Sequence, residues 1–275
     1  MASTVDKRFP VPAALKEHGP ARIIAMCNQK GGVGKTTSSI NLAAALAEYG
    51  RKVLVVDFDP QGAFTAGLGM VAGEINIHTI MMDDSIDPHE AIKQTNIENL
   101  DLIPANIDLS AAEVQLVGVM GREHILNGVL QKVKNEYDVI LIDCQPSLGL
   151  LTVNALAAAH GVLIPVACEI FALRGVALLL DTLEKVRSRK INETVKLDGI
   201  LATMYDARTL HSREVLEQLR EAFKGDLLKT IISRTVKFPD SNSARTPITE
   251  YASRSEGAES YRALARELVA RGCTP

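Results

Sequence analysis

Residues 21–37 read ARIIAMCNQKGGVGKTT, and a helical pattern runs over residues 36–49. An apolar run, a glycine loop and then a helix are the context in which a phosphate-binding loop occurs. Glycines allow successive backbone N–H groups to converge on phosphate oxygens, and the helix N-terminus adds the positive end of its dipole. The stretch therefore predicts a nucleotide phosphate site between a strand and a helix.

Two side chains of this loop carry the expected chemistry. Lys35 would neutralise charge on the β- and γ-phosphates, and the hydroxyl of Thr36 would ligate Mg²⁺. A tight glycine turn with surface lysines is the alternative, but the glycines, the GKT triplet and the strand–helix context together argue against it. The predicted nucleotide-binding residues are Gly31, Gly32, Val33, Gly34, Lys35, Thr36 and Thr37.

Further apolar runs have the features of buried parallel strands. They are continuous rather than alternating, and helical patterns separate them, which is typical of a parallel sheet covered on both faces. Right-handed crossovers then give a doubly wound α/β fold with a mostly parallel sheet. The expected strands lie in residues 21–28, 52–59, 99–105, 137–144, 161–167 and 197–205, and the expected helices in 36–49, 109–117, 121–135, 149–159, 173–188, 210–223 and 256–271.

The first 20 residues differ from the rest of the chain. They contain Pro10, Pro12 and Pro20 and show no sustained hydrophobic period, which predicts a flexible N-terminal arm over residues 1–20. No linker-like break follows. Residues 21–275 are therefore predicted to form a single domain that contains the phosphate-binding loop, a size that one large α/β domain allows.

Composition excludes several classes of protein. Of the 275 residues, 47% are hydrophobic and 23% are charged, which rules out disorder for the bulk of the chain. Residues 1–20 lack an apolar secretory core, and no run of 18 uncharged apolar residues occurs, so a transmembrane helix is not expected. Cys27, Cys144, Cys168 and Cys273 form no CxxC pair, which argues against a zinc site and a disulfide framework.

Two of the apolar runs end in carboxylates. Residues 52–62, KVLVVDFDPQG, place Asp57 and Asp59 at the end of one strand, and residues 137–143, YDVILID, place Asp143 at the end of another. The carboxyl ends of parallel strands lie over the crevice where ligands bind. Beside a phosphate-binding loop, Asp143 is predicted to hold a Mg²⁺-bound water. A polar turn that caps a strand is the alternative for Asp57 and Asp59.

The glycine loop departs from the standard spacing G-x-x-x-x-G-K-[ST]. Gln29 stands where the first glycine belongs, and Lys30 is an additional lysine. In this form KGGVGKTT, residues 30–37, resembles the ParA/MinD group of deviant P-loop ATPases, and DFDPQG at residues 57–62 matches a motif of ParA proteins. The resemblance implies ATP and Mg²⁺ as cofactors. It also implies a nucleotide-bound homodimer in which Lys30 reaches the partner's phosphates.

The same resemblance implies roles for the carboxylates. Asp59 would position or activate the attacking water, and Asp57 would support Mg²⁺ through water. Residues 143–147 read DCQPS where the family usually has DCPPS, so Gln145 leaves Asp143 intact but stands in the following loop. The implied metal residues are Thr36, Asp57 and Asp143, and the implied catalytic residues are Lys30, Lys35 and Asp59.

Two downstream segments narrow the resemblance to the ParA/Soj subgroup, and with IDLSAAE at residues 107–113 the match is closest to actinobacterial ParA-like proteins. The two segments are TMYDART at residues 203–209 and ISRTVKF at residues 232–238, within a similarity that runs from Arg22 to Leu268. The subgroup implies that Arg208 and Lys237 bind double-stranded DNA non-specifically once ATP has closed the dimer. It also implies a ParB-like partner that stimulates slow hydrolysis, and a cytoplasmic, nucleoid-associated location.

Other members of the deviant P-loop group remain as alternatives. A MinD-like membrane-associated ATPase needs a basic amphipathic C-terminal helix, and residues 256–271 offer only a small apolar face, so stable membrane association is not expected. A protein-cargo-positioning ATPase stays open, as does the choice between chromosome and plasmid. The residues that flank Cys144 and Cys168 do not support a nitrogenase-type cluster at these cysteines. The segments at residues 203–209 and 232–238 are typical of DNA-binding relatives and argue against a biosynthetic ligase.

Overall fold

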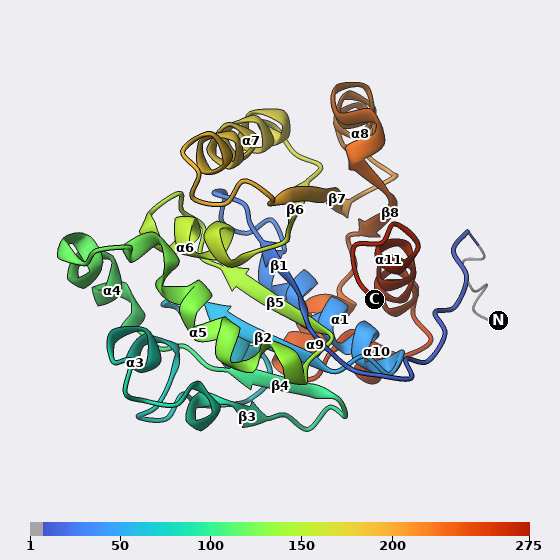
Figure 1. Cartoon of the computed structure of the whole chain (residues 1–275). Coiled ribbons are helices and arrows are strands. Elements are labelled where there is room, and N and C mark those ends of the chain that lie inside the picture. The colour runs from blue at the N-terminus through green and yellow to red at the C-terminus, as the bar shows by residue number, and fades with distance from the viewer. Residues whose placement is uncertain (1–7) are drawn as a thin grey trace.

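A computed structural model describes residues 8–275 and shows one eight-stranded sheet with the order β3-β4-β2-β5-β1-β6-β7-β8 (Figure 1). Neighbouring strands are parallel, except that β3 runs antiparallel to β4. The strands are β1 (Arg22–Met26), β2 (Val53–Phe58), β3 (Lys93–Gln94), β4 (Leu100–Ile103), β5 (Val139–Cys144), β6 (Gly161–Ala167), β7 (Lys196–Tyr205) and β8 (Leu227–Ser233). This is the doubly wound α/β fold that the sequence predicts.

Helices cover both faces of the sheet and bury an apolar cluster on each. One cluster includes residues of α1 (Lys35–Glu48), α2 (Ala63–Gly67), α10 (Ile248–Tyr251) and α11 (Glu256–Ala270), and α9 (Lys237–Ser243) packs beside it. The opposite cluster includes residues of α3 (Ile77–Met82), α4 (Leu109–Gln115), α5 (Ile125–Val133), α6 (Leu150–Ala158), α7 (Ala172–Ser188) and α8 (Leu210–Phe223).

The first strand lies at the centre of the sheet. β1 pairs with β5 on one side and with β6 on the other. From β1, the strand order therefore proceeds toward both edges of the sheet. In open α/β sheets a ligand crevice forms at such a switch point, outside the carboxyl ends of the strands. The glycine loop that follows β1 therefore stands at the position where this fold binds ligands.

Two strands were not expected from the sequence. β8 is an edge strand whose apolar run is interrupted by the exposed Lys229, a charge that discourages pairing with another chain. β3 has only two residues, which is too short for a periodic signal. The pattern over 121–135 also divides, since a short 3₁₀ turn at Arg122–His124 precedes α5.

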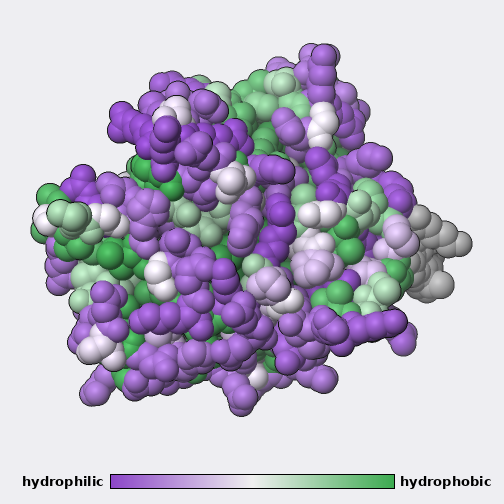
Figure 2. All heavy atoms as spheres, viewed as in Figure 1, coloured by the Kyte–Doolittle hydropathy of each residue, from purple (hydrophilic) through white to green (hydrophobic). Residues whose placement is uncertain are grey.

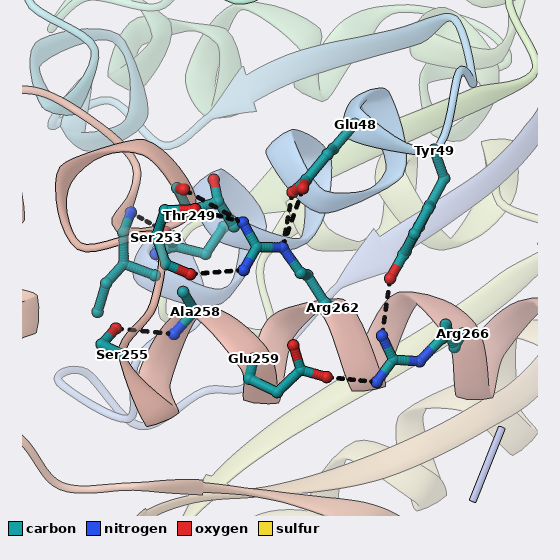
Figure 3. Close-up of polar contacts among 11 residues, drawn as sticks. Glu48, Tyr49, Thr249, Ser253, Ser255, Ala258, Glu259, Arg262 and Arg266 are labelled. Carbon is teal, nitrogen blue, oxygen red and sulfur yellow. Dashed lines mark hydrogen bonds and ion pairs between the residues drawn. The ribbon is translucent and has the colours of Figure 1, made fainter. Parts of the chain in front are cut away.

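The last helix is fixed to the first one. Arg262 of α11 donates to both carboxylate oxygens of Glu48, at 3.0 and 2.8 Å, and to the carbonyl of Ser253 (Figure 3). One turn later, Arg266 donates to the hydroxyl of Tyr49 at 2.8 Å. The apolar side chains of the helix, Tyr261, Leu264 and Leu268, are buried beneath these contacts, as its pattern predicts.

Residues 8–20 have no helix or strand but contact the body of the protein. The buried carboxylate of Asp138 accepts hydrogen bonds from the backbone N–H groups of Gly19 and Lys52 and contacts Nδ1 of His18 at 2.8 Å. The guanidinium of Arg51 donates to the carbonyl of Ala13 at 2.9 Å. Residues 1–7 of the predicted arm lie outside the described residues. Over residues 8–275, no helix has the length and apolar character to cross a membrane.

Candidate nucleotide site

Backbone conformation of the glycine loop explains its sequence. Gly32 and Gly34 have φ values of +72° and +85°, the left-handed region that favours glycine. A Cβ atom at Gly31 or Gly32 would meet nothing within 4 Å, so the loop borders open space instead of protein. The loop thus exposes its backbone N–H groups beside the N-terminus of α1, as a phosphate site requires.

Hydrogen bonds to two other strands hold the loop in place. Asn28 donates to the carbonyl of Pro165 at 2.7 Å and accepts from the backbone N–H of Lys30 at 2.9 Å. The hydroxyl of Thr203 donates to the carbonyl of Val33 at 2.8 Å. Because these partners belong to β6 and β7, the loop is organised before any ligand arrives. Sequence reasoning assigned no such role to Asn28 or Thr203.

Lys35 begins α1 and is buried under the loop, with 6% of the residue exposed. Its ammonium donates to the carbonyl of Lys30 at 3.2 Å. Burial lowers the pKa of Lys35, and the nearby charges of Asp143 and Asp59 act in the opposite direction. A cation buried in this way gains from an anion brought to the loop, which suits the predicted phosphate role.

Two buried carboxylates lie side by side below the loop. Asp57 and Asp143 are register partners at the ends of β2 and β5, and both are 0% exposed. Thr65 donates to Oδ2 of Asp57 through its N–H and its hydroxyl, at 2.8 and 2.7 Å. Ser39 donates to Oδ1 of Asp143 at 2.7 Å. The sequence pattern did not identify Thr65 or Ser39 as partners.

One oxygen of each carboxylate, Oδ1 of Asp57 and Oδ2 of Asp143, has no hydrogen-bond partner among the described residues. Leaving such an oxygen buried is costly unless a cation or a donor compensates it. Mg²⁺ prefers oxygen ligands and keeps several of its waters. The residues therefore fit the predicted ion, which the hydroxyl of Thr36 would ligate and the two carboxylates would hold through water. The described residues contain no cluster of three or more His, Cys, Asp or Glu suited to another metal.

Both buried carboxylates have raised pKa values. Burial, with Asp143 as the next cause, raises the pKa of Asp57 to about 7. Burial also raises the pKa of Asp143 to about 6, and the hydrogen bond from Ser39, the nearby hydroxyl of Thr36 and the charge of Lys35 oppose the change. The ionised forms are thus unfavourable until a cation arrives.

We expect Asp143→Asn to stabilise the ligand-free protein at pH 8. A carboxyl whose folded-state pKa is raised weakens folding as pH rises from its unfolded value toward its folded one, and asparagine removes that loss while still accepting from Ser39. The gain should be on the order of 2 kcal/mol, or about 5 °C in melting temperature, and should vanish at pH 3.5. Melting curves without ligand measure this gain in stability. Melting curves with Mg²⁺-ADP measure the stabilisation by ligand, of which the variant should lose the part that depends on the metal.

The remaining predicted catalytic residues lie at the border of the site. Asp59 is half-buried after β2, accepts from the N–H of Gln61 at 2.9 Å, and acts electrostatically on Lys35 and Asp143. Lys30 is exposed, and its ammonium lies 3.0 Å from Oε2 of Glu169. The other oxygen of Glu169 accepts from Arg234 at 3.3 Å. Neither Glu169 nor Arg234 was predicted at this border.

A cavity of about 610 Å³ opens next to the loop. Gly34, Thr37 and Thr203 contribute to its lining, together with mostly apolar surface from other residues. A cavity with a mostly apolar lining beside a phosphate loop suits a nucleotide base. Its lining residues also include Met204, Arg208, Ile232, Arg234, Val236, Phe238 and Tyr261.

The two predicted DNA-binding residues lie outside the phosphate loop. Arg208 follows β7 with 86% of its side chain exposed, and it forms a two-point ion pair with Asp206, at 2.9 and 2.8 Å. The pair lowers the pKa of Asp206 to about 2. Lys237 is exposed at the start of α9.

Gln145, the departure from the family pattern, has a defined partner. Its side-chain amide donates to Oε1 of Glu113 in α4 at 3.1 Å, and its backbone N–H donates to the carbonyl of Phe58. The loop after Asp143 is therefore tied to α4 and to the end of β2.

A loop of this kind, at the switch point of a parallel sheet and above a buried lysine and two unsatisfied carboxylates, defines the class of P-loop nucleotide-binding proteins. Comparison with known proteins narrows the class. A family model described as an AAA domain matches residues 21–197. The Mycobacterium tuberculosis protein Rv1708 is 54% identical over 267 residues, which cover 96% of this chain and 84% of the relative.

A second curated relative and a solved structure are also similar to the chain. The sporulation initiation inhibitor protein Soj of Bacillus subtilis is 47% identical over 253 residues, 91% of this chain and 99% of Soj. A crystal structure of cobyrinic acid a,c-diamide synthase from Mycobacterium smegmatis, with bound ADP and magnesium, has a TM-score of 0.79 at 40% identity and covers 92% and 96% of the two chains. The chain belongs to the ParA/Soj family of partition ATPases. The resemblance expected from residues 30–37 and 203–209 is thereby confirmed.

Proposed function

We propose that the protein is an ATP-driven dimerisation switch that binds non-specific DNA in its ATP state and partitions a chromosome or plasmid together with a ParB-like partner. The observation that carries the proposal is the pair of unsatisfied carboxylate oxygens, on Asp57 and Asp143, below a loop whose backbone faces open space. Relatives that bear the names Soj and ParA share 45–47% identity with this chain, which supports the partition role.

The site residues have separate roles in the binding and hydrolysis of ATP. Backbone N–H groups of the loop and the ammonium of Lys35 bind the phosphates, and Thr36 orients the metal. Thr36, Asp57 and Asp143 would hold Mg²⁺, which would supply positive charge against the negative charge that develops during phosphoryl transfer. Asp59, half-buried and close to Lys35, orients a water and accepts its proton. Turnover stays slow until a partner completes the site.

Exposed residues around the site support dimerisation with a second copy of the chain. Lys30 is exposed there and can leave Glu169 for a partner's phosphates. Figure 2 shows apolar surface in the region of α4. Its exposed side chains include Val114, Val117 and Met120, and α4 contacts the loop after Asp143 through Glu113. Apolar surface of this kind marks interaction sites.

The predicted DNA-binding role of Arg208 can be tested by changing either member of its ion pair with Asp206. We expect Arg208→Glu to weaken binding to random-sequence duplex DNA at least about tenfold in the ATP state, because phosphate contacts dominate non-specific affinity and dimerisation doubles each loss. Asp206→Asn is the matched control. It frees the guanidinium and should strengthen binding about twofold to fivefold. Fluorescence anisotropy gives both affinities, and ATP-dependent dimerisation should persist in each variant.

The proposal as a whole rests on nucleotide control of DNA binding. The decisive experiment measures binding to random duplex DNA with Mg²⁺ and ATP, ADP or no nucleotide, at two salt concentrations. Binding only with ATP, weakened by salt, supports the switch and a nucleoid location. DNA binding that ignores the nucleotide, or none in any state, contradicts it.

Alternative roles predict other results in the same preparation. A membrane role would need a free amphipathic helix, whereas the apolar side of α11 is buried against the body and its arginines are engaged with α1 (Figure 3). Recruitment to liposomes by ATP would favour the MinD-like role over the partition role. Retained dimerisation without DNA or lipid binding would favour the positioning of a protein cargo.

A further inference from the structure

Two of the four cysteines meet directly below the phosphate loop. Cys27 follows β1 and Cys144 ends β5, and their Sγ atoms lie 3.3 Å apart. Both are buried, with 1% and 2% exposed. The register of the two strands pairs Met26 with Asp143, so the cysteines are the next neighbours across the ladder. Their separation of 117 residues concealed this contact in the sequence.

We propose that Cys27 and Cys144 form a reversible oxidation site and that their disulfide weakens nucleotide binding. The step removes one hydrogen from each thiol and forms one S–S bond. A hydroperoxide is the oxidant, since it accepts the two electrons and two protons as its O–O bond breaks, and hydrogen peroxide yields two waters. A dithiol reverses the step by thiol–disulfide exchange.

The strand geometry allows this bond. Neighbouring strands lie about 4.8 Å apart, and disulfides bridge Cα atoms separated by about 4.4–6.8 Å. The sulfurs must approach from 3.3 Å to about 2.05 Å. The bond therefore requires a small displacement at the ends of β1 and β5 and no separation of the sheet.

That displacement falls on groups that shape the nucleotide site. Asn28, which follows Cys27, holds the N–H of Lys30 and the carbonyl of Pro165. Asp143, which precedes Cys144, carries an unpartnered oxygen toward the expected metal. A close-packed core transmits such a change, and a misplacement of about 1 Å can cost about a hundredfold in a working site. We expect the disulfide to reduce nucleotide affinity at least about tenfold.

Coupling of this kind acts in both directions. If the disulfide weakens nucleotide binding, bound nucleotide must disfavour the disulfide by the same factor. A tenfold effect makes the disulfide easier to reduce by about 30 mV when the site is saturated. The loop closed on its ligand should also slow the oxidant's access to this buried pair.

This inference rests on the proposed nucleotide binding, and the experiment separates the two. The full-length protein is treated with hydrogen peroxide at neutral pH, digested under non-reducing conditions and mapped by mass spectrometry, while Mg²⁺-ADP affinity is measured before oxidation, after it, and after dithiothreitol. We expect a peptide that joins Cys27 to Cys144, lighter by two hydrogens, a reversible loss of affinity, and slower oxidation with Mg²⁺-ADP present.

Matched variants complete the test. Cys27→Ala and, independently, Cys144→Ala should bind Mg²⁺-ADP in both conditions without a response to peroxide. Cys168→Ala should respond as the native protein does, because Cys168 lies near Ser212 and away from the pair. Absence of the cross-linked peptide in folded protein, or a cross-link with unchanged ADP affinity, would overturn the inference. Failure of the reduced native protein to bind ADP would instead overturn the proposed function.

Discussion

Replacing Lys35 with alanine should lower ATP affinity by about 30- to 5,000-fold. The ammonium is buried under the loop, so its removal leaves the charge of the bound phosphates without a buried cation. Truncating one partner of a buried, hydrogen-bonded charge pair costs about 2–5 kcal/mol, which corresponds to this range. Titration of a fluorescent ATP analogue in the presence of Mg²⁺ measures the loss directly.

Two comparisons show whether the loss is specific. The melting temperature without ligand should not fall, because burial already lowers the pKa of Lys35 and makes the charged form unfavourable in the ligand-free fold. Lys30→Ala is the matched lysine variant. It should bind ATP as a monomer and fail at ATP-dependent dimerisation. Ordinary ATP affinity in Lys35→Ala would contradict the assignment of the loop.

Replacing Asp59 with alanine should slow hydrolysis by about a hundredfold or more while ATP binding persists. A positioned general base contributes about 10²–10⁴ to a rate, and Asp59 is the half-buried carboxylate next to the loop that can approach a water. The ATP-bound dimer should then accumulate. Single-turnover hydrolysis and light scattering after size-exclusion chromatography give the two readings.

A control for Asp59 comes from the exposed surface. Asp84→Ala removes a carboxylate from an exposed turn after α3 and should leave both the rate and the dimer fraction as in the native protein. Unchanged hydrolysis in Asp59→Ala would remove Asp59 from the mechanism. A loss of ATP binding would assign it to metal binding instead.

The sequence predicts the fold and the centre of the site because both depend on local pattern. The continuous apolar runs of β1, β2 and β5 identify a parallel sheet, and the end of each run marks a residue at the crevice. The glycines at 32 and 34 have the positive φ values that their place in the loop demands. These features need only the immediate neighbours along the chain.

The hydrogen-bond and ion-pair partners of the site residues could not be predicted from the sequence, because they belong to distant segments of the chain. Thr65 and Ser39 are ordinary hydroxyl residues until the fold places them on Asp57 and Asp143. Glu169 gains its role only when the end of β6 meets Lys30. β8 was missed for a different reason: an exposed lysine breaks its apolar run at the sheet edge.

The central position of β1 has a consequence for the protein's synthesis. β1 leaves the ribosome first, yet its two neighbours, β5 and β6, begin at residues 139 and 161 (Figure 1). At a translation rate of about 5–20 residues per second, its backbone groups wait roughly 7–28 s for both partners. The phosphate loop therefore takes shape late, after about half of the chain has emerged, so nucleotide has no formed site to bind on the early nascent chain. An apolar strand exposed for so long is a natural target for chaperones that act on nascent polypeptides.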